Sequence, residues 1–374
     1  MHYSSLITIL FISIFSINSV NASCIPKFTY KNGWLGSDDA YSIKLPNKKT
    51  IWLFGDTFIS KNKNLNGFEK REFKEDTIIG NSIAISKCEG PEFKHEYFFN
   101  DRNNKRSSFF QHPQEDLHYK YWPRDGFYHE GKVYIYQFDV IPTTGGNMGF
   151  AMPSTTLTII ENPLDHPSQW KMRFIKQKLP NNILIGSTVI KKDNTIYIYA
   201  TLDRPLNSFQ AISVFKTNIE DIEDNSKLYF LNNDQVWEKI NRLDENADNL
   251  FQVMSNGSME LTIRFNKTIN QWVAIYIGNA IMDEHIKYRL SSSPIGPWSE
   301  EKVLLPIKER NKNTNQAIAQ PYCYAAKEHP QYKQQDNEII LSYICNSFDL
   351  KTILGNEEVY LPKIIKIDSK QLLQ

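Results

Sequence analysis

The chain has 374 residues, of which 41% are hydrophobic and 13% aromatic, so it can bury a large core in one all-β unit or in two domains. Its 43 basic and 42 acidic residues give a formal net charge of +1. Neither a basic patch nor a run of like charges stands out, which removes the electrostatic argument for binding nucleic acid or an anionic membrane surface.

The first 22 residues predict a secretory signal peptide. The apolar stretch from Leu6 to Ile17 is too short to span a bilayer, and Val20-Asn21-Ala22 suits cleavage after Ala22. A lipid anchor on Cys24 is the alternative, although Asn21 stands where a lipobox has an aliphatic residue. We therefore expect a secreted or periplasmic protein with no membrane segment after removal of the signal.

Four cysteines follow the predicted signal peptide, and in an oxidising compartment this even number predicts two disulfides. Cys323 and Cys345 are the expected local pair on neighbouring antiparallel strands. Cys24 and Cys88 would then tie the N-terminus to the first sheet. The sequence has no CxxC spacing and its histidines are scattered, so we expect no metal site and no cofactor.

Five times along the chain, a turn of small residues opens onto a short strand with alternating apolar residues. A second strand-like segment follows each of these after a polar turn, and a third follows in four cases. The irregular repeat of roughly 65 residues predicts β-meanders stacked around one axis. We expect an all-β, five-bladed β-propeller of antiparallel four-stranded blades. The predicted inner strands lie within residues 36–43, 122–128, 186–190, 257–262 and 320–326.

Three longer segments interrupt this repeat. Residues 60–77, 100–121 and 228–255 are expected to form loops or short helices over one face of the propeller. Within the last of them, residues 234–250 are predicted to be helical, on thin apolar periodicity.

Several motifs resemble the secreted family called domain of unknown function 4185, over roughly residues 25–349. The resemblance implies one five-bladed propeller domain spanning residues 23–374, similar to the arabinanases and xylosidases of glycoside hydrolase family 43. Some members of the family are endo-D-arabinanases, so it also implies a polysaccharide substrate. We further expect a monomer. The motifs are Trp34–Ser42, Trp52–Phe58, Met259–Phe265, Ser293–Trp298, and His329-Pro330 before Leu341-Ser342-Tyr343.

Glycoside hydrolysis requires a protonated carboxylic acid and a carboxylate that activates water or attacks the sugar. By analogy with family 43, Asp39 is expected to be the base or nucleophile, Asp125 the residue that orients the acid, and Glu260 the acid. Desolvation would raise the pKa of Glu260 toward about 6–7. Asp38 is the alternative to Asp39, because side chains alternate along a strand and one of the two should face away.

Each of these carboxylates also has a structural interpretation. Asp38 is typical of a turn residue that satisfies backbone donors. A turn or an ion pair with Arg124 would explain Asp125, and an ion pair with Arg264 would explain Glu260. Asp56 ends a second strand, where a hydrogen bond within a turn is its expected role.

The predicted substrate-binding residues surround these carboxylates. Trp34, Trp122 and Tyr324 are expected to stack on sugar rings, with packing between blades as the alternative. Further candidates are Arg124, Arg264 and the loop residue His329.

The sequence contains no serine-hydrolase elbow, phosphate-binding loop or zinc-protease motif. It therefore predicts a secreted glycoside hydrolase acting on an arabinan-like furanoside. A carbohydrate-binding propeller without catalysis is the alternative. A protein-interaction scaffold is a third, if the segments at 100–121 and 228–255 close the mouth of the channel.

Overall fold

The computed structural model describes residues 24–60, 62, 71, 77–103, 105–144, 149–180, 183–202, 210–279, 283–310 and 321–374. The predicted signal peptide at 1–22 and most of the segment at 60–77 lie outside the described residues. None of the helices in these ranges has the length and hydropathy needed to cross a bilayer.

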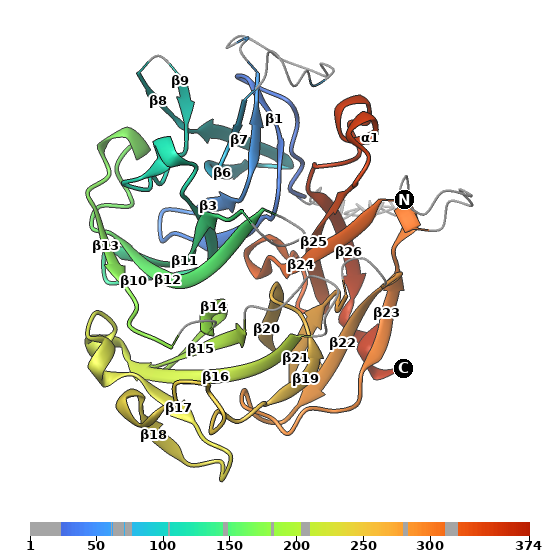
Figure 1. Ribbon diagram of the computed structural model, residues 1–374. Helices are drawn as coiled ribbons and strands as arrows, with labels where there is room; N and C mark the ends of the chain where they lie inside the picture. The colour runs from blue at the N-terminus through green and yellow to red at the C-terminus, as the bar shows by residue number, and fades with distance from the viewer. Residues whose placement is uncertain are drawn as a thin grey trace, which may run out of the picture.

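In the described part of the chain, five antiparallel sheets follow one another in sequence and surround a common centre (Figure 1). Their first strands are neighbours in space, because β2 lies beside β10, β10 beside β14, β14 beside β20, and β20 beside β24. The first sheet contains β2 (Tyr41–Lys44), β3 (Lys49–Phe54), β6 (Ser82–Glu89) and β7 (Glu92–Phe98). The second contains β10 (Lys120–His129), β11 (Lys132–Pro142), β12 (Phe150–Ile160) and β13 (Met172–Lys176).

The remaining three sheets complete the ring. The third contains β14 (Ile183–Lys192), β15 (Thr195–Leu202), β16 (Gln210–Asn218), β17 (Tyr229–Leu231) and β18 (Trp237–Lys239), and β19 (Met254–Gly257) also pairs with β16. The fourth contains β20 (Leu261–Asn266), β21 (Gln271–Tyr276), β22 (His285–Ser291) and β23 (Lys302–Pro306). The fifth contains β24 (Tyr322–Glu328), β25 (Glu338–Asn346) and β26 (Lys363–Asp368).

Short elements lie outside these five sheets. They are β1 (Trp34–Ser37), β4 (Thr57–Ile59) and β5 (Thr77–Ile79) in one small sheet, β8 (Asn100–Arg102) and β9 (Lys105–Ser107) in another, and the short helix α1 (Leu350–Gly355).

The sequence predicted the five inner strands and the strands that follow them, and the structure contains all of these. Four-stranded sheets were expected throughout, and this is correct for the first, second and fourth sheets only. Over the described residues, the third sheet is larger and the fifth has three strands. The helix predicted at 234–250 is wrong, since this segment holds β18 and a single 3-10 turn at Ile240–Arg242. Pairing of β17 with β18 satisfies its backbone groups and extends the third sheet instead.

The hydrophobic core lies between neighbouring sheets. Each of five large clusters of buried side chains draws members from two adjacent sheets, and one of them joins the fifth sheet to the first. Burial of these interfaces therefore holds the ring together and closes it. Side chains that share a cluster are Ile43 and Ile135 (sheets 1 and 2), Ile159 and Ile198 (2 and 3), Tyr199 and Ile263 (3 and 4), Ile275 and Leu341 (4 and 5), and Ile340 and Trp52 (5 and 1).

Glycine allows a close approach between the second and third sheets. Gly186 on β14 has a φ of +105°, and a Cβ atom there would lie 2.2 Å from the Cβ of Tyr136 on β11. Only glycine fits this contact without moving a strand.

Polar contacts add to the closure between the fifth and first sheets. The Oγ of Ser42 lies 2.7 Å from the Nδ1 of His329, and the hydroxyls of Ser86 and Tyr332 are also 2.7 Å apart. These bonds join residues that are 287 and 246 positions apart in sequence, so the fifth sheet meets the first and the ring is closed.

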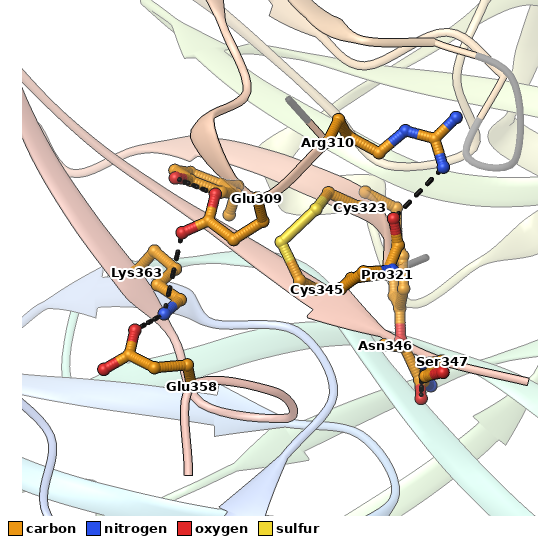
Figure 2. The surroundings of a disulfide bond; sticks show 11 residues. Glu309, Arg310, Pro321, Cys323, Cys345, Asn346, Ser347, Glu358 and Lys363 are labelled. Carbon is orange, nitrogen blue, oxygen red and sulfur yellow. Dashed lines mark hydrogen bonds and ion pairs between the residues drawn. A yellow bond between two sulfur atoms is a disulfide. The ribbon is translucent and has the colours of Figure 1, made fainter. Parts of the chain in front are cut away.

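Both predicted disulfides are confirmed. Cys24 is bonded to Cys88 on β6, and Cys323 is bonded to Cys345 directly across β24 and β25 (Figure 2). Crosslinks of this loop length contribute about 3–4 kcal/mol each in the chain-entropy model. The second crosslink also fixes the strand next to Asn346, which lies in the pocket described below.

Candidate active site

A pocket of about 230 Å³ lies where the first strands of the sheets begin. All five sheets, or the connections next to them, contribute to its wall. None of the described residues in the segments 100–121 and 228–255 lines it, so the lining does not favour the scaffold alternative. The lining residues are Asp38, Asp39, Gly55, Asp56, Trp122, Arg124, Phe150, Met152, Gln210, Ser258, Met259, Glu260, Gly278, Tyr322, Tyr324, Asn346 and Tyr360.

Both members of the Asp38-Asp39 pair line this pocket. The expectation that one of them faces away is wrong because neither lies in a strand. They form the connection between β1 and β2, and Asp39 has a φ of +60°, which breaks the alternation of side chains. Both pack against Gly55, where a Cβ atom would come within 3.3 Å of the Asp38 side chain and 3.5 Å of an Asp39 oxygen.

Asp39 and Glu260 share one guanidinium nitrogen. The Nη1 of Arg124 donates to Asp39 Oδ2 at 3.0 Å and to Glu260 Oε1 at 2.7 Å. Arg124 is buried, and its guanidinium lies 4.5 Å from the centre of the Phe138 ring. Burial and the negative charge of Glu260 raise the pKa of Asp39 well above its ordinary value, although Arg124 acts in the opposite direction. The proposed pairing of Glu260 with Arg264 is not formed.

Asp38 is held by two phenols, Tyr324 on β24 and Tyr360 in the connection between β25 and β26. The hydroxyl of Tyr324 donates to its Oδ1, and the hydroxyl of Tyr360 donates to its Oδ2 at 3.0 Å. Desolvation, followed by the negative charge of Asp56, raises the pKa of Asp38 from 3.8 to about 7, and the two phenols moderate this shift. Asp38 is therefore a carboxyl group that holds its proton close to neutral pH.

Asp56 has a different environment on the same wall. The Nζ of Lys120 donates to both of its carboxylate oxygens, at 2.7 and 2.6 Å, and the indole Nε1 of Trp122 donates at 2.8 Å. These contacts balance a negative charge. The sequence predicted only a turn role for Asp56. It lies at the pocket because β3 ends there and Gly55 turns the chain toward Asp38.

Asp125 does not line the pocket, which corrects its expected place beside the acid. Its Oδ2 accepts from Thr188 Oγ1 at 2.8 Å, from the Val189 amide at 2.9 Å and from Arg264 Nη2 at 3.1 Å. The positive charge of Arg264 and these hydrogen bonds outweigh the cost of burial and lower its pKa. Asp125 directly follows Arg124 on β10, and successive strand side chains point to opposite faces, so only Arg124 lines the pocket.

Three predicted substrate-binding residues also lie elsewhere. Arg264 bonds to Asp125 and lines a separate depression beside the ends of β2 and β10. Trp34 is fully buried, stacks on Tyr97 with ring centres 4.2 Å apart, and belongs to the core. The structural interpretation is the correct one for Trp34.

His329 is equally remote from the pocket. It is fully buried, with its ring nitrogens 2.7 Å from Ser42 Oγ and 2.8 Å from Ser342 Oγ. Burial lowers its pKa to about 3, so it remains neutral and structural. Of the predicted sugar-binding side chains, the pocket retains Trp122, Tyr324 and Arg124.

Sequence reasoning missed several residues of the pocket wall. Tyr322 had a signal, because it lies two positions before Tyr324 and alternation puts both on one face of β24. Others come from strand ends and connections distant in sequence and carried no signal. These are Phe150, Met152, Gln210, Asn346 and Tyr360.

Lys327 is a further residue that the sequence analysis did not select. It is buried on β24, and its Nζ donates to the carbonyl oxygens of Ser187 on β14, at 3.0 Å, and Leu261 on β20. The ammonium also lies 3.9 Å from the centre of the Tyr41 ring. Burial lowers its pKa to about 7. The residue thus joins the first strands of three sheets at the centre of the ring.

Among the described residues, one group of three side chains lies close enough together to be considered as a metal site. These are Glu309, Cys323 and Cys345, but the two cysteines are consumed by their disulfide.

A family model described as a domain of unknown function, DUF5005, matches residues 26–369. This corrects the resemblance to domain of unknown function 4185, which is a different family. No curated protein matches the sequence.

Solved structures have a similar fold at low sequence identity. A protein from Bacteroides ovatus, provisionally assigned as a hydrolase, has a TM-score of 0.70 at 17% identity, with 92% of this chain and 88% of that chain covered. A xylan β-1,4-xylosidase from Bacillus halodurans has a TM-score of 0.51 at 13% identity, with 91% of this chain but 55% of the xylosidase covered. An endo-arabinase from Bacteroides thetaiotaomicron has a TM-score of 0.46 at 14% identity, with 91% and 98% covered. The likeness to the first two shows a β-propeller fold of the kind found in glycoside hydrolases.

Proposed function

The chain belongs to the family described as a domain of unknown function, DUF5005, and from its pocket we propose that it is an exported glycoside hydrolase acting on a polysaccharide. In this proposal the five sheets are the blades of a five-bladed propeller, and the pocket at the start of their first strands is the active site. The fold shared with a xylosidase supports the architecture, whereas the chemistry has to be argued from the carboxyl groups.

The observation that carries the proposal is the contrast between Asp38 and Asp56. A glycosidase needs one carboxyl that holds a proton at its working pH and a second that is ionised. Asp38 has a pKa near 7, raised in part by the charge of Asp56. Asp56 is ion-paired with Lys120. We therefore assign Asp38 as the general acid that protonates the leaving oxygen, and Asp56 as the carboxylate that activates water or attacks the sugar.

This assignment differs from the analogy that made Glu260 the acid and Asp39 the base. A proton on Glu260 would weaken its short bond to Arg124, and Asp39 is buried and ion-paired with the same guanidinium. In the proposal, Arg124, Asp39 and Glu260 form the polar floor of the pocket. They donate hydrogen bonds to sugar hydroxyls and accept hydrogen bonds from them. Trp122 and Tyr324 offer aromatic surface beside the reacting unit.

The charge of the pocket favours neutral sugar units. Four carboxyl groups line it against one lining cation, Arg124, and Lys120 is engaged by Asp56, so an acidic sugar would be repelled. A volume of about 230 Å³ leaves room for one sugar unit, and the choice of a pentose follows from the fold shared with a xylosidase. We propose an arabinan-like furanoside as the first candidate substrate and xylan as the second.

A propeller that binds carbohydrate without cleaving it remains the rival. The ion pairs of Glu260 and Asp56 favour this rival, because a purely binding site would also balance its buried charges in this way. The two functions differ in whether Asp38 must release a proton.

The test is product release from D-arabinan, L-arabinan and xylan by the wild type, Asp38→Asn and Asp56→Asn. We expect the wild type to cut at least one polymer and each substitution to lower the rate by about 10²–10⁴-fold, the contribution typical of general acid and base groups. Asp139→Asn is the control, since Asp139 is more buried than Asp38 and Asp56 and is bonded to Ser154 and Thr156 but does not line the pocket. Binding of a polymer without cleavage, unchanged in both variants, would establish the rival function.

A further inference from the structure

A row of three aromatic rings leads from Asp38 out of the pocket to the surface. Tyr324 donates to Asp38, and its ring lies 5.7 Å from that of Tyr322 at an interplanar angle of 21°. The Tyr322 ring in turn lies 4.6 Å from that of Phe348, at 27°. The two tyrosines line the pocket, whereas Phe348 lies beyond its lining and is 50% exposed.

The loop that carries Phe348 is anchored on both sides. The amide of Ser347 donates to Asn346 Oδ1 at 2.7 Å, and the amide of Asp349 donates to Ser347 Oγ at 3.0 Å. Asp349 then caps α1 by accepting from the amides of Lys351 and Thr352. A large apolar ring is therefore held at the surface by local hydrogen bonds, with its inner face on Tyr322 and its outer side open to solvent.

The size of the pocket bears on what the Phe348 ring can bind. Pockets that enclose a whole drug-sized ligand measure roughly 300–1,000 Å³, and this one is smaller, at about 230 Å³. A polysaccharide bound at Asp38 must therefore continue over the rim. The apolar C–H face of a sugar ring packs well on an aromatic face, and an aromatic ring loses little conformational entropy when it is covered.

We propose that Phe348 is a sugar-binding subsite that stacks on a unit of the polysaccharide just outside the pocket and so makes longer chains better substrates. This inference rests on the proposed function and adds to it a residue that determines the preference for polymeric substrate. Phe348 contacts no reacting atom, so it acts through binding and leaves the chemical step unchanged.

The experiment compares the wild type with Phe348→Ala on arabinan and on the shortest arabino-oligosaccharide that the wild type cleaves, and on the corresponding xylan series if xylan is the substrate. Removal of one exposed stacking contact is expected to raise KM for the polymer about 5–10-fold with kcat unchanged, and to leave the shortest substrate unaffected. Phe348→Trp should retain the wild-type KM. Phe174→Ala is the matched control, because Phe174 is 40% exposed and stacked on Tyr121 but lies away from the pocket on β13.

Retardation of the same variants in gels containing each polysaccharide separates this inference from the proposed function. Cleavage by the wild type with an unchanged KM in Phe348→Ala would overturn the inference and leave the function standing, as would equal losses on long and short substrates. If a polysaccharide retards the wild type without being cleaved, and Phe348→Ala is no longer retarded, the hydrolase proposal is overturned and the subsite is supported. Neither cleavage nor retardation on any polymer would overturn both.

Discussion

Two groups of charged residues lie around the centre of the ring, and they differ in how their charges are balanced. In the pocket, Asp38 and Asp39 have raised pKa values because burial and neighbouring carboxylates outweigh their donors. In the second group, Asp125 has a lowered pKa because Arg264 and two donors on β14 surround it. The two aspartates Asp38 and Asp125 thus have opposite effects on stability at neutral pH.

Under the proposed function, this difference separates the acidic residues that would serve chemistry from those that serve the fold. A carboxyl with surplus negative charge nearby destabilises the ionised protein, and such a group persists where function requires it. Asp125 joins β10, β14 and β20, so its ionised carboxylate stabilises the contact between these sheets. Lys327 also joins β24 to β14 and β20 through hydrogen bonds, although burial disfavours its charged form.

The largest predicted effect concerns the pH dependence of activity, which tests the raised pKa of Asp38 against the lowered pKa of Asp125. If protonated Asp38 is the general acid, kcat/KM should fall about tenfold per pH unit above about 7, and so about 100-fold by pH 9. The groups that face Asp38 are Asp56, Glu260, Tyr324 and Tyr360.

Tyr324→Phe provides the control for this assignment. Loss of a donor to the carboxylate should raise the pKa of Asp38 and move the alkaline limb to higher pH. Thermal unfolding at each pH shows whether the protein stays folded. A limb that does not move in Tyr324→Phe would assign it to another group, such as Lys327, whose pKa is also about 7.

The next effect in size is the loss of stability in Asp125→Asn. Removing one partner of a fully buried ion pair costs about 3–5 kcal/mol, and because the Arg264 side chain is 26% exposed we expect about 2–3 kcal/mol at pH 7. Because the pKa of Asp125 is lowered in the folded protein, its ionised carboxylate stabilises the fold above pH 3.8, the ordinary pKa. This stabilisation is lost as the pH falls through the pKa of the folded state. The difference in the free energy of unfolding between the variant and the wild type should therefore shrink below pH 3.8. A difference that is independent of pH would show that the charge of Asp125 is not what stabilises the fold.

The smallest effect has the opposite sign, a gain of stability in Asp38→Asn. Between pH 3.8 and about 7 the folded protein retains a proton that the unfolded chain has released, so stability falls as the pH rises through this window. Since the pocket is open to solvent, we expect the substitution to stabilise by about 1–2 kcal/mol at pH 8 and to have little effect at pH 4. Chemical denaturation at the two pH values measures this. A loss of stability at pH 8 would mean that the bonds from Tyr324 and Tyr360 matter more than the burial of charge.

Much of the fold could be predicted because its signals are local. Alternating apolar residues in segments such as Lys132–Pro142 and Thr195–Leu202 determine strands, and short polar turns between them determine antiparallel pairing. The pairing of Cys323 with Cys345 followed from the same pattern. The extra strands of the third sheet escaped prediction because β18 and β19 are short and depend on pairing with residues already in place.

The sequence by itself determined a chain of repeated β-meanders, its two disulfides, and the segments that would supply carboxylates near the start of the inner strands. Only the tertiary structure decided which carboxylates meet. Asp38 and Asp39 share the pocket because a positive φ breaks strand alternation, and Asp125 is held outside it by Thr188, Val189 and Arg264. The charge balance that distinguishes Asp38 from Asp125 comes from partners such as Tyr360 and Arg264, which lie more than 130 residues away in sequence. Electrostatic interactions act through space, so residue order along the chain does not reveal them.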